Sequence, residues 1–145
     1  MFPDSSLVRQ QVIAEAESWL HTPFMHNALI KGVGVGCGTL LIATYGALGV
    51  PVPKLEEIGH FSRDWHEHTR DERYLNVLLK YSRIVNEPKT GDMVVFRMGR
   101  VHSHSALIAE WPRVIHVLWG SVVQYAQADH MPLQKLSRIY LSPFV

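Results

Sequence analysis

The sequence lacks the features that would brace the chain covalently or place it in a membrane. Its 145 residues include one cysteine, so no internal disulfide can form. No apolar run approaches the roughly 20 residues that a membrane-spanning helix needs, which excludes an inserted form. The first residues show no basic segment followed by an apolar one, and we expect no secretory signal there.

An excess of charge of one sign is also missing. The formal net charge is +1 with neutral histidines, and 14 basic residues are scattered among 13 acidic ones. A nucleic-acid-binding surface would require a basic patch or stripe, so we expect no such partner. Repeats, low-complexity segments and linkers are absent as well. The length suits one core, and we predict a single domain over residues 1–145.

The first half of the chain has helical patterning. Apolar residues at helical spacing predict a first helix that Ser5 or Ser6 caps and that ends before Pro23. A second predicted helix begins at Cys37 and ends at Gly49. The stretch 54–68 is polar and irregular. Capping-box spacing at 69–72, followed by apolar residues as far as position 84, predicts a third helix.

After Pro88 the pattern changes to that of extended structure. Predicted strands cover 93–97, 105–110, 114–119, 122–125 and 137–141. Because helices come first and strands second, we predict an α+β fold with N-terminal helices packed on a mainly antiparallel sheet.

The single cysteine lies where a nucleophile would be built. Cys37 follows the glycine-rich run 31–36 and begins a predicted helix. Unpaired N–H groups at a helix start lower the pKa of a thiol and can donate to an oxyanion. The glycines would allow a substrate to approach the backbone. A buried, unreactive cysteine is the simplest alternative for a lone thiol.

Histidines on the predicted strands supply the other groups that such a nucleophile needs. A cysteine peptidase requires an imidazole base and a polar group that orients it. If consecutive strands pair as antiparallel neighbours, His104 can be the base and His116 the orienting residue. His102 shares a strand face with His104, so alternation does not choose between them. The other histidines are expected in loops: His21, His26, His60, His66, His68 and His130.

The ordered motifs resemble a known family over most of the chain. They are 19–26 (WLHTPFMH), 31–37 (KGVGVGC), 91–96 (GDMVVF) and the two histidines already named. The combination resembles the NlpC-type cell-wall cysteine peptidases, which are papain-like enzymes with a permuted chain order, and especially the small forms from phage tails and gene-transfer agents. This resemblance implies that Cys37 is the nucleophile, His104 the general base and His116 the orienting residue. It also implies that Asp92 is the turn residue before the central strand.

Two departures from the family pattern concern the substrate. Relatives usually have an aspartate before the cysteine and often a serine after it, which help to bind the free amine of a stem peptide; this chain has Gly36 and Gly38. Many relatives have a tyrosine after the Thr-Pro pair, whereas this chain has Phe24. Our candidate substrate-binding residues are Phe24, Gly36, Gly38 and Ser103.

The resemblance implies hydrolysis of peptidoglycan stem or crosslink peptides through a cysteine acyl-enzyme, without a cofactor. It further implies synthesis in the bacterial cytoplasm, assembly into a virion tail or gene-transfer-agent particle beside tail-hub proteins, and wall opening during genome delivery. The oxyanion would accept hydrogen bonds from the Cys37 backbone N–H and from a second donor that the sequence does not identify.

Three other interpretations remain open at this point. A structural tail-tip or hub protein could keep the fold with a decayed site, which Gly36, Gly38 and Phe24 favour. An acyltransferase would resolve the same acyl-cysteine with an amine instead of water. A zinc site could use Cys37 together with His102, His104 and His116, although the sequence contains neither a paired Cys-x-x-Cys nor a His-Glu-x-x-His signature.

Overall fold

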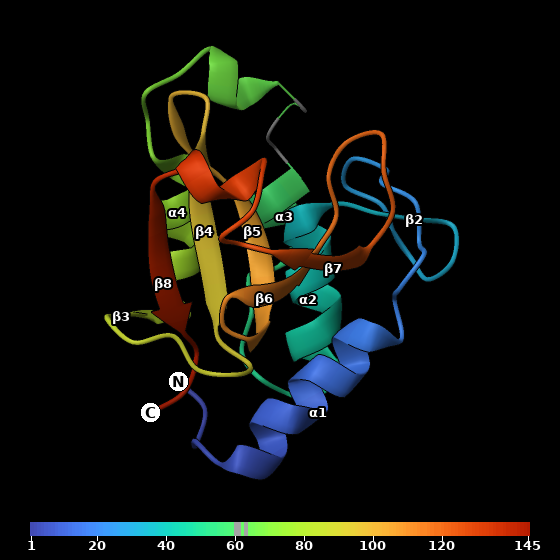
Figure 1. The fold of residues 1–145 in the computed structure, drawn as a ribbon, viewed down its shortest axis with the longest axis vertical. Helices are drawn as coiled ribbons and strands as arrows, with labels where there is room; N and C mark the ends of the chain where they lie inside the picture. The colour runs from blue at the N-terminus through green and yellow to red at the C-terminus, as the bar shows by residue number, and fades with distance from the viewer. Residues whose placement is uncertain (60–61, 63) are drawn as a thin grey trace.

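The computed structural model describes residues 1–59, 62 and 64–145. A long first helix and a two-stranded hairpin precede the helix that begins at Cys37 (Figure 1). The helices are α1 (Ser6–Glu17), α2 (Cys37–Gly46), α3 (Leu55–Gly59) and α4 (Arg73–Leu79), with 3-10 turns η1 (Trp65–Glu67) and η2 (Leu133–Lys135). The strands are β1 (Leu29–Ile30), β2 (Gly34–Val35), β3 (Arg83–Val85), β4 (Met93–Met98), β5 (Val101–Glu110), β6 (Arg113–His116), β7 (Gln124–Gln127) and β8 (Arg138–Ser142).

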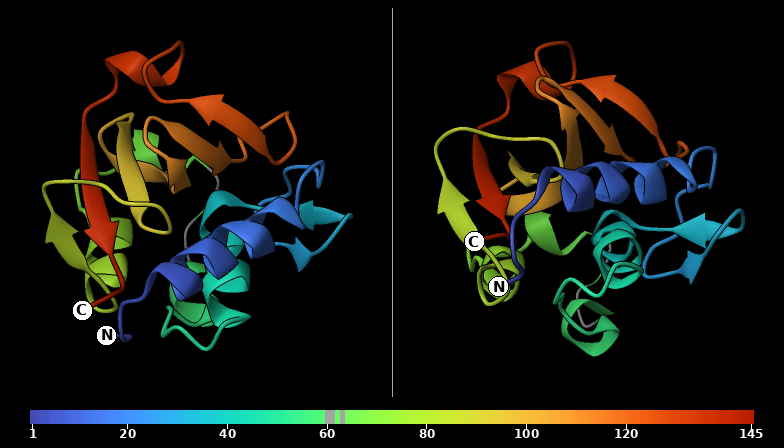
Figure 2. Two further views of the ribbon diagram at one scale, coloured as in Figure 1. Left: turned by 60° about the horizontal axis from the view of Figure 1, so that its bottom comes forward. Right: turned by 90° about the horizontal axis from the view of Figure 1, so that it is seen from below.

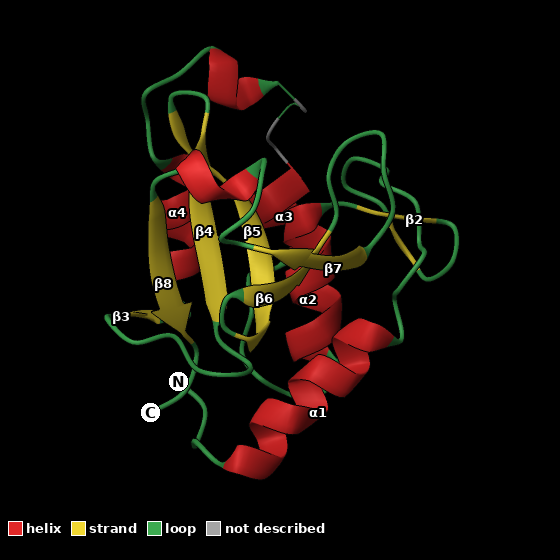
Figure 3. Ribbon diagram, viewed as in Figure 1, coloured by secondary structure: helices red, strands yellow, loops and turns green. Residues whose placement is uncertain are grey.

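The main sheet has six strands in the order β3-β8-β4-β5-β6-β7, and all of its pairings are antiparallel. The four α-helices lie on one side of it (Figures 2 and 3). The predicted α+β class and the helix-on-sheet arrangement are therefore confirmed.

The sheet buries both of its faces. Alternate residues such as Val95 and Leu107 join α1, α2 and α4 in the larger core, while Val94 and Phe96 belong to a smaller core on the other face. The smaller core is closed by Ala128 and Leu133, from the segment before β8. Burial on both faces explains why the strand segments read as nearly continuous apolar runs.

Buried polar contacts attach the helices to the start of β4. Arg9 of α1 donates to an Asp92 carboxylate oxygen at 2.9 Å and to the Thr90 carbonyl oxygen at 2.9 Å. Tyr45 of α2 donates to the Gly91 carbonyl oxygen at 2.7 Å. Asp92 directly precedes β4, as predicted. These contacts hold α2, and therefore its first residue, in a fixed relation to the sheet.

The helix predictions need five corrections. α1 ends at Glu17 and α2 at Gly46, a few residues before the predicted ends at Pro23 and Gly49. The helix predicted from 69–72 begins at Arg73, because Thr69 Oγ1 accepts the N–H of Asp71 in a local turn instead of capping a helix. Position 84 lies in β3, which pairs with β8. The stretch 54–68, read as irregular, contains α3 and η1.

The strand boundaries shift by a few residues. β5 begins at Val101, β6 ends at His116, and the predicted strand 122–125 lies instead at β7, Gln124–Gln127. The hairpin β1–β2 and strand β3 were not predicted; they are two or three residues long, too short for a periodic signal. Among the described residues, no helix has the length and apolar character needed to span a bilayer.

Candidate active site

Cys37 is the first residue of α2. The preceding Gly36 is extended, and its N–H donates to Thr39 Oγ1 at 2.8 Å, which holds the entry to the helix. Gly36 has no side chain with which to cap the first turn. The backbone N–H of Gly38 is directed at the thiol and favours its thiolate form. The placement of the cysteine at a helix start, predicted from sequence, is confirmed.

The two predicted histidines lie together. Neighbouring strands β5 and β6 carry His104 and His116, which are 4% and 2% exposed. His104 Nε2 is 2.8 Å from His116 Nδ1, and Phe96 stacks on the His104 ring. His116 therefore fixes the orientation of the His104 ring.

His102 has a different environment from that of His104. Its backbone N–H donates to Glu72 Oε1 at 3.0 Å, and its Nδ1 lies 2.6 Å from Glu72 Oε2. The register of β4 and β5 shifts between Phe96 and Arg97, next to this point. The structure thus separates two histidines that strand alternation had left equivalent.

Burial makes this site electrically neutral. It lowers the pKa of His104 to about 3, with a smaller contribution from the neighbouring His116, and it lowers the pKa of His116 to about 4. It also raises the pKa of the Cys37 thiol, an effect that nearby N–H and hydroxyl groups only partly oppose. At neutral pH the resting site consists of an uncharged thiol and two uncharged imidazoles.

Two hydroxyl groups beside the thiol were not foreseen. Tyr74 Oη and Ser105 Oγ lie 2.7 Å apart in the interior, and the Ser105 hydroxyl donates to the Cys37 carbonyl oxygen at 3.4 Å. Both hydroxyls favour the thiolate and lower the pKa of Cys37. Tyr74 comes from α4, and in the sequence it was one of the apolar positions that predicted a third helix. Its position by the thiol depends on tertiary packing, so no local signal could have identified it.

Cys37 and His104 line one cavity of about 130 Å³. The four candidate substrate-binding residues line it too: Phe24, Gly36, Gly38 and Ser103. The carbonyl oxygen of Ser103 accepts a hydrogen bond from Cys37 Sγ at 3.7 Å. The Ser103 hydroxyl donates to the Met98 carbonyl oxygen at 2.8 Å. His26 and His66, which the sequence assigned to loops, also line this cavity, while His60 lies outside the described residues.

No family model matches the sequence, and no curated protein matches it. Solved structures do match. A lipoprotein-like protein of the NLP/P60 family from Staphylococcus aureus has a TM-score of 0.71 at 15% identity, over 99% of this chain and 43% of that one. This chain therefore spans less than half of the staphylococcal protein.

Two further matches are domains of nearly the same length. The NlpC/p60 domain of the peptidoglycan hydrolase SagA has a TM-score of 0.63 at 14% identity, over 92% of this chain and 97% of that one. RipD from Mycobacterium tuberculosis, described as a non-catalytic NlpC/p60 domain protein adapted to peptidoglycan binding, has a TM-score of 0.62 at 17% identity, over 93% and 96%.

The chain has the NlpC/P60 fold. This agrees with the permuted papain-like architecture that the sequence motifs implied.

Within this NlpC/P60 fold, the two glycines beside Cys37 are not equivalent. A β-carbon at Gly38 would lie 2.9 Å from Ile58 Cγ2 and 3.3 Å from Tyr74 Oη, so α3 and α4 leave no room for a side chain there. A β-carbon at Gly36 would have its nearest neighbours at 3.5 Å, an ordinary van der Waals distance. Packing accounts for Gly38, whereas nothing in the packing requires Gly36.

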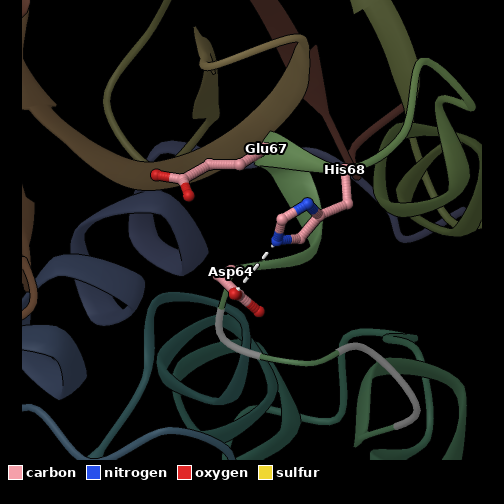
Figure 4. Close-up of side chains that lie close together, drawn as sticks. All are labelled: Asp64, Glu67 and His68. Atoms are coloured by element: carbon pink, nitrogen blue, oxygen red, sulfur yellow. Dashed lines mark hydrogen bonds and ion pairs between the residues drawn. The ribbon is translucent and has the colours of Figure 1, made fainter.

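The possible metal ligands that lie close together in the described residues are not the four that the sequence suggested for zinc. Within residues 1–59, 62 and 64–145, the ligand atoms close enough together to hold an ion belong to Asp64, Glu67 and His68, all of them exposed (Figure 4). His68 Nε2 is 3.2 Å from Asp64 Oδ2, which accounts for this cluster as a surface ion pair. His102 is turned to Glu72 and away from such a set.

Proposed function

We propose that this protein is a cysteine peptidase of the NlpC/P60 family that hydrolyses the peptides of peptidoglycan. The observation that carries the proposal is a single cavity lined both by Cys37, at the start of α2, and by His104, whose ring is held by His116. The similarity in fold to the SagA domain, which belongs to a peptidoglycan hydrolase, supports this substrate class.

The histidine pair defines how the thiol is activated. In the tautomer that serves catalysis, His104 Nε2–H donates to His116 Nδ1, and His116 carries its own proton on Nε2. His104 Nδ1 is then left with a lone pair. Because both imidazoles are neutral at physiological pH, this nitrogen can accept the Cys37 proton as sulfur attacks the amide carbonyl.

The remaining steps use the same residues. The negative oxygen of the tetrahedral intermediate accepts a hydrogen bond from the Cys37 backbone N–H at the start of α2. His104 then gives its proton to the leaving amine, and a thioester remains on Cys37. Water attacks the thioester with His104 again acting as base, which releases the acid product and restores the thiol.

The biological setting forms a separate part of the proposal. We propose, from the sequence motifs shared with small phage-tail and gene-transfer-agent peptidases, that the protein is assembled into a particle tail beside hub proteins and acts on the wall during genome delivery. Mass spectrometry of purified particles tests this part. Recovery of the chain with tail proteins supports it, and absence of the chain from intact tails contradicts it.

Digestion of purified sacculi tests the enzymatic part. Wild-type protein is incubated under reducing conditions with and without a chelator, beside Cys37→Ala, and soluble fragments are analysed by mass spectrometry. Peptide fragments from the wild type alone, produced equally with chelator, are expected. Fragments from Cys37→Ala, or loss of activity with the chelator, would contradict a cysteine mechanism.

A non-catalytic peptidoglycan-binding protein is the second candidate. It is favoured by the raised pKa of Cys37, which leaves the resting thiol protonated, and by the fold similarity to the non-catalytic RipD. This candidate predicts that wild type and Cys37→Ala bind sacculi equally and that neither releases fragments.

A further inference from the structure

Two buried hydroxyls form a short chain of hydrogen bonds that ends on the Cys37 backbone. The Ser105 hydroxyl donates to the Cys37 carbonyl oxygen at 3.4 Å, and Tyr74 Oη lies 2.7 Å from Ser105 Oγ. A hydroxyl has one proton to donate. Because Ser105 gives its proton to the carbonyl oxygen, Tyr74 is the donor in the shorter bond. The chain therefore runs from Tyr74 through Ser105 to Cys37.

The bond from Ser105 to the carbonyl oxygen is the weaker link. Hydrogen bonds from a hydroxyl to an oxygen are usually about 2.7–2.8 Å long, which the Tyr74–Ser105 bond matches and the other bond exceeds. The Cys37 carbonyl also belongs to α2, where helical geometry gives it the N–H of Leu41 as a second donor. Ser105 can therefore turn to another acceptor without leaving this buried carbonyl unpaired.

The Cys37 sulfur is that other acceptor. Ser105 lies opposite Val95 in the sheet, on the face that packs against the helices and beside the thiol. At rest the sulfur donates to the Ser103 carbonyl oxygen at 3.7 Å. Once the thiol has lost its proton, this partly negative oxygen faces a negative sulfur and destabilises it. The thiolate then needs hydrogen-bond donors, and the backbone N–H and hydroxyl of Ser105 are placed to supply them.

We infer that Ser105 is a further catalytic residue, whose hydroxyl turns from the Cys37 carbonyl oxygen to the Cys37 sulfur when the thiol ionises. The inference rests on the proposed peptidase function and adds a residue to it. The thiol proton goes to His104 Nδ1, and neither hydroxyl loses its own proton. Tyr74 continues to donate to Ser105 Oγ, which polarises the serine O–H and strengthens its bond to sulfur.

Alkylation by iodoacetamide measures this role without a peptide substrate. Cys37 is the only cysteine in the sequence and lines the cavity, so the alkylation rate against pH reports the ionisation of this thiol. Ser105→Ala should move the midpoint of the profile up by about one pH unit, which is a tenfold loss of thiolate at pH 7. Ser82→Ala is the matched control and should leave the midpoint unchanged, because Ser82 is also buried and its hydroxyl donates to a backbone carbonyl, that of Leu78.

The other titratable groups near the thiol are the same in all three proteins. Among the described residues, those that contact the thiol, line its cavity or lie behind the cavity wall are His26, His66, Tyr74, His104 and His116. Their effects on the alkylation profile are common to wild type and both variants. The difference between the profiles therefore isolates the serine hydroxyl.

Infrared spectroscopy tests the turn of the hydroxyl itself. Because the chain has one cysteine, cysteine labelled with ¹³C at its carbonyl places the label at Cys37 alone. A carbonyl that loses a hydrogen bond absorbs at a higher wavenumber. The labelled band should therefore rise as the wild-type thiol ionises, and it should rise less in Ser105→Ala, which has no hydroxyl to withdraw.

The outcomes separate the inference from the proposed function. An unchanged alkylation midpoint in Ser105→Ala, or a wild-type band that does not rise on ionisation, would overturn the inference. The band is measured on wild type, so it decides the question even where Ser105→Ala fails to fold. On peptidoglycan peptides Ser105→Ala should lose about tenfold in kcat/KM at pH 7, and an unchanged value would overturn the catalytic role. Cleavage of no peptide by wild type would contradict the peptidase, while alkylation and infrared results still decide where the hydroxyl donates.

Discussion

The two ends of strand β4 stabilise buried polar groups in opposite ways, one with a charged pair and the other with two neutral rings. At its start, Arg9 and Asp92 form an ion pair whose members are 8% and 1% exposed. Near its other end, Phe96 lies beside His104, whose ring has another imidazole as its hydrogen-bond partner within the part of the chain that the structure describes. The first site stays charged because opposite charges meet. The second stays neutral because burial favours the uncharged imidazoles.

This difference distinguishes a pair that holds the fold from a pair that suits the proposed chemistry. A paired buried charge is costly to break and has no proton to exchange near neutral pH, so the Arg9–Asp92 pair holds α1 against β4. A neutral imidazole keeps a lone pair that can accept a proton from a bound reactant, and burial makes the resulting charged ring costly. Changes at the Arg9–Asp92 pair should therefore reduce stability, and changes at the histidine pair should reduce activity.

The largest effect is expected at the base. His104→Ala removes the group that accepts the thiol proton, and kcat should fall by about 10³-fold or more. Thermal unfolding should show a folded protein. Retention of more than a tenth of the wild-type rate on sacculi would show that another group acts as base.

The ion pair should show the opposite behaviour. Asp92→Asn removes the buried partner of Arg9 and leaves only the more exposed Asp4 to pair with it, which should reduce the free energy of unfolding by about 3 kcal/mol. Lys80→Ala, which breaks the exposed pair with Glu57, is the control and should cost about 0.5 kcal/mol. Urea titration gives both values. Equal losses in the free energy of unfolding would mean that the buried Arg9–Asp92 pair stabilises the fold no more than an exposed pair does.

His116 should respond to the chemistry of its replacement. Asparagine can still present an acceptor to His104 Nε2–H, whereas alanine cannot, so His116→Ala should lose roughly 10²-fold in kcat and His116→Asn much less. A structural role alone would reduce stability without this split in kcat. Equal kcat values for the two variants would show that His116 does not orient the base.

Acid should affect the two regions in different pH ranges. The folded pKa values of His104 and His116, about 3 and 4, lie below the unfolded value of 6.5, so the unfolded chain binds more protons between these limits. Stability should therefore fall as pH drops from 6.5 towards 4, and His116→Asn should reduce the slope. Hydrogen bonding to Arg9 lowers the pKa of Asp4, so its contribution is lost only below about pH 3.8. Unfolding by urea across this range measures both effects, and a pH-independent stability above pH 4 would contradict burial of neutral histidines.

The smallest effect is expected at the unforeseen hydroxyl. Tyr74→Phe removes a group that favours the thiolate and leaves Ser105 without that partner, so kcat should fall by roughly tenfold and stability by about 1 kcal/mol. Tyr81→Phe, which removes a half-buried hydroxyl bound to Glu57, is the matched control and should leave kcat unchanged. An unchanged rate in Tyr74→Phe would limit Tyr74 to packing against Gly38.

Much of this arrangement was readable from local sequence. The glycine-rich approach to Cys37 predicted a helix start, and consecutive strands predicted the pairing that brings His104 to His116. Residues that act through distant contacts could not be found in this way. Thr69 was read as a cap although it closes a local turn, and Tyr74 was read only as an apolar position of a helix although its hydroxyl lies beside the thiol. Short elements such as α3 escaped because five residues give no period, yet Ile58 of α3 explains why position 38 is glycine.

Hydrolysis in ¹⁸O-labelled water tests the central claim most directly. Defined peptidoglycan peptides are digested by wild type and by Cys37→Ala, and the new carboxyl group is examined by mass spectrometry. Attack of water on a Cys37 thioester predicts one ¹⁸O in the new carboxyl group from wild type and no product from Cys37→Ala. A product that carries an amine instead of ¹⁸O would identify an acyltransferase, and equal cleavage by Cys37→Ala would remove Cys37 from the chemistry.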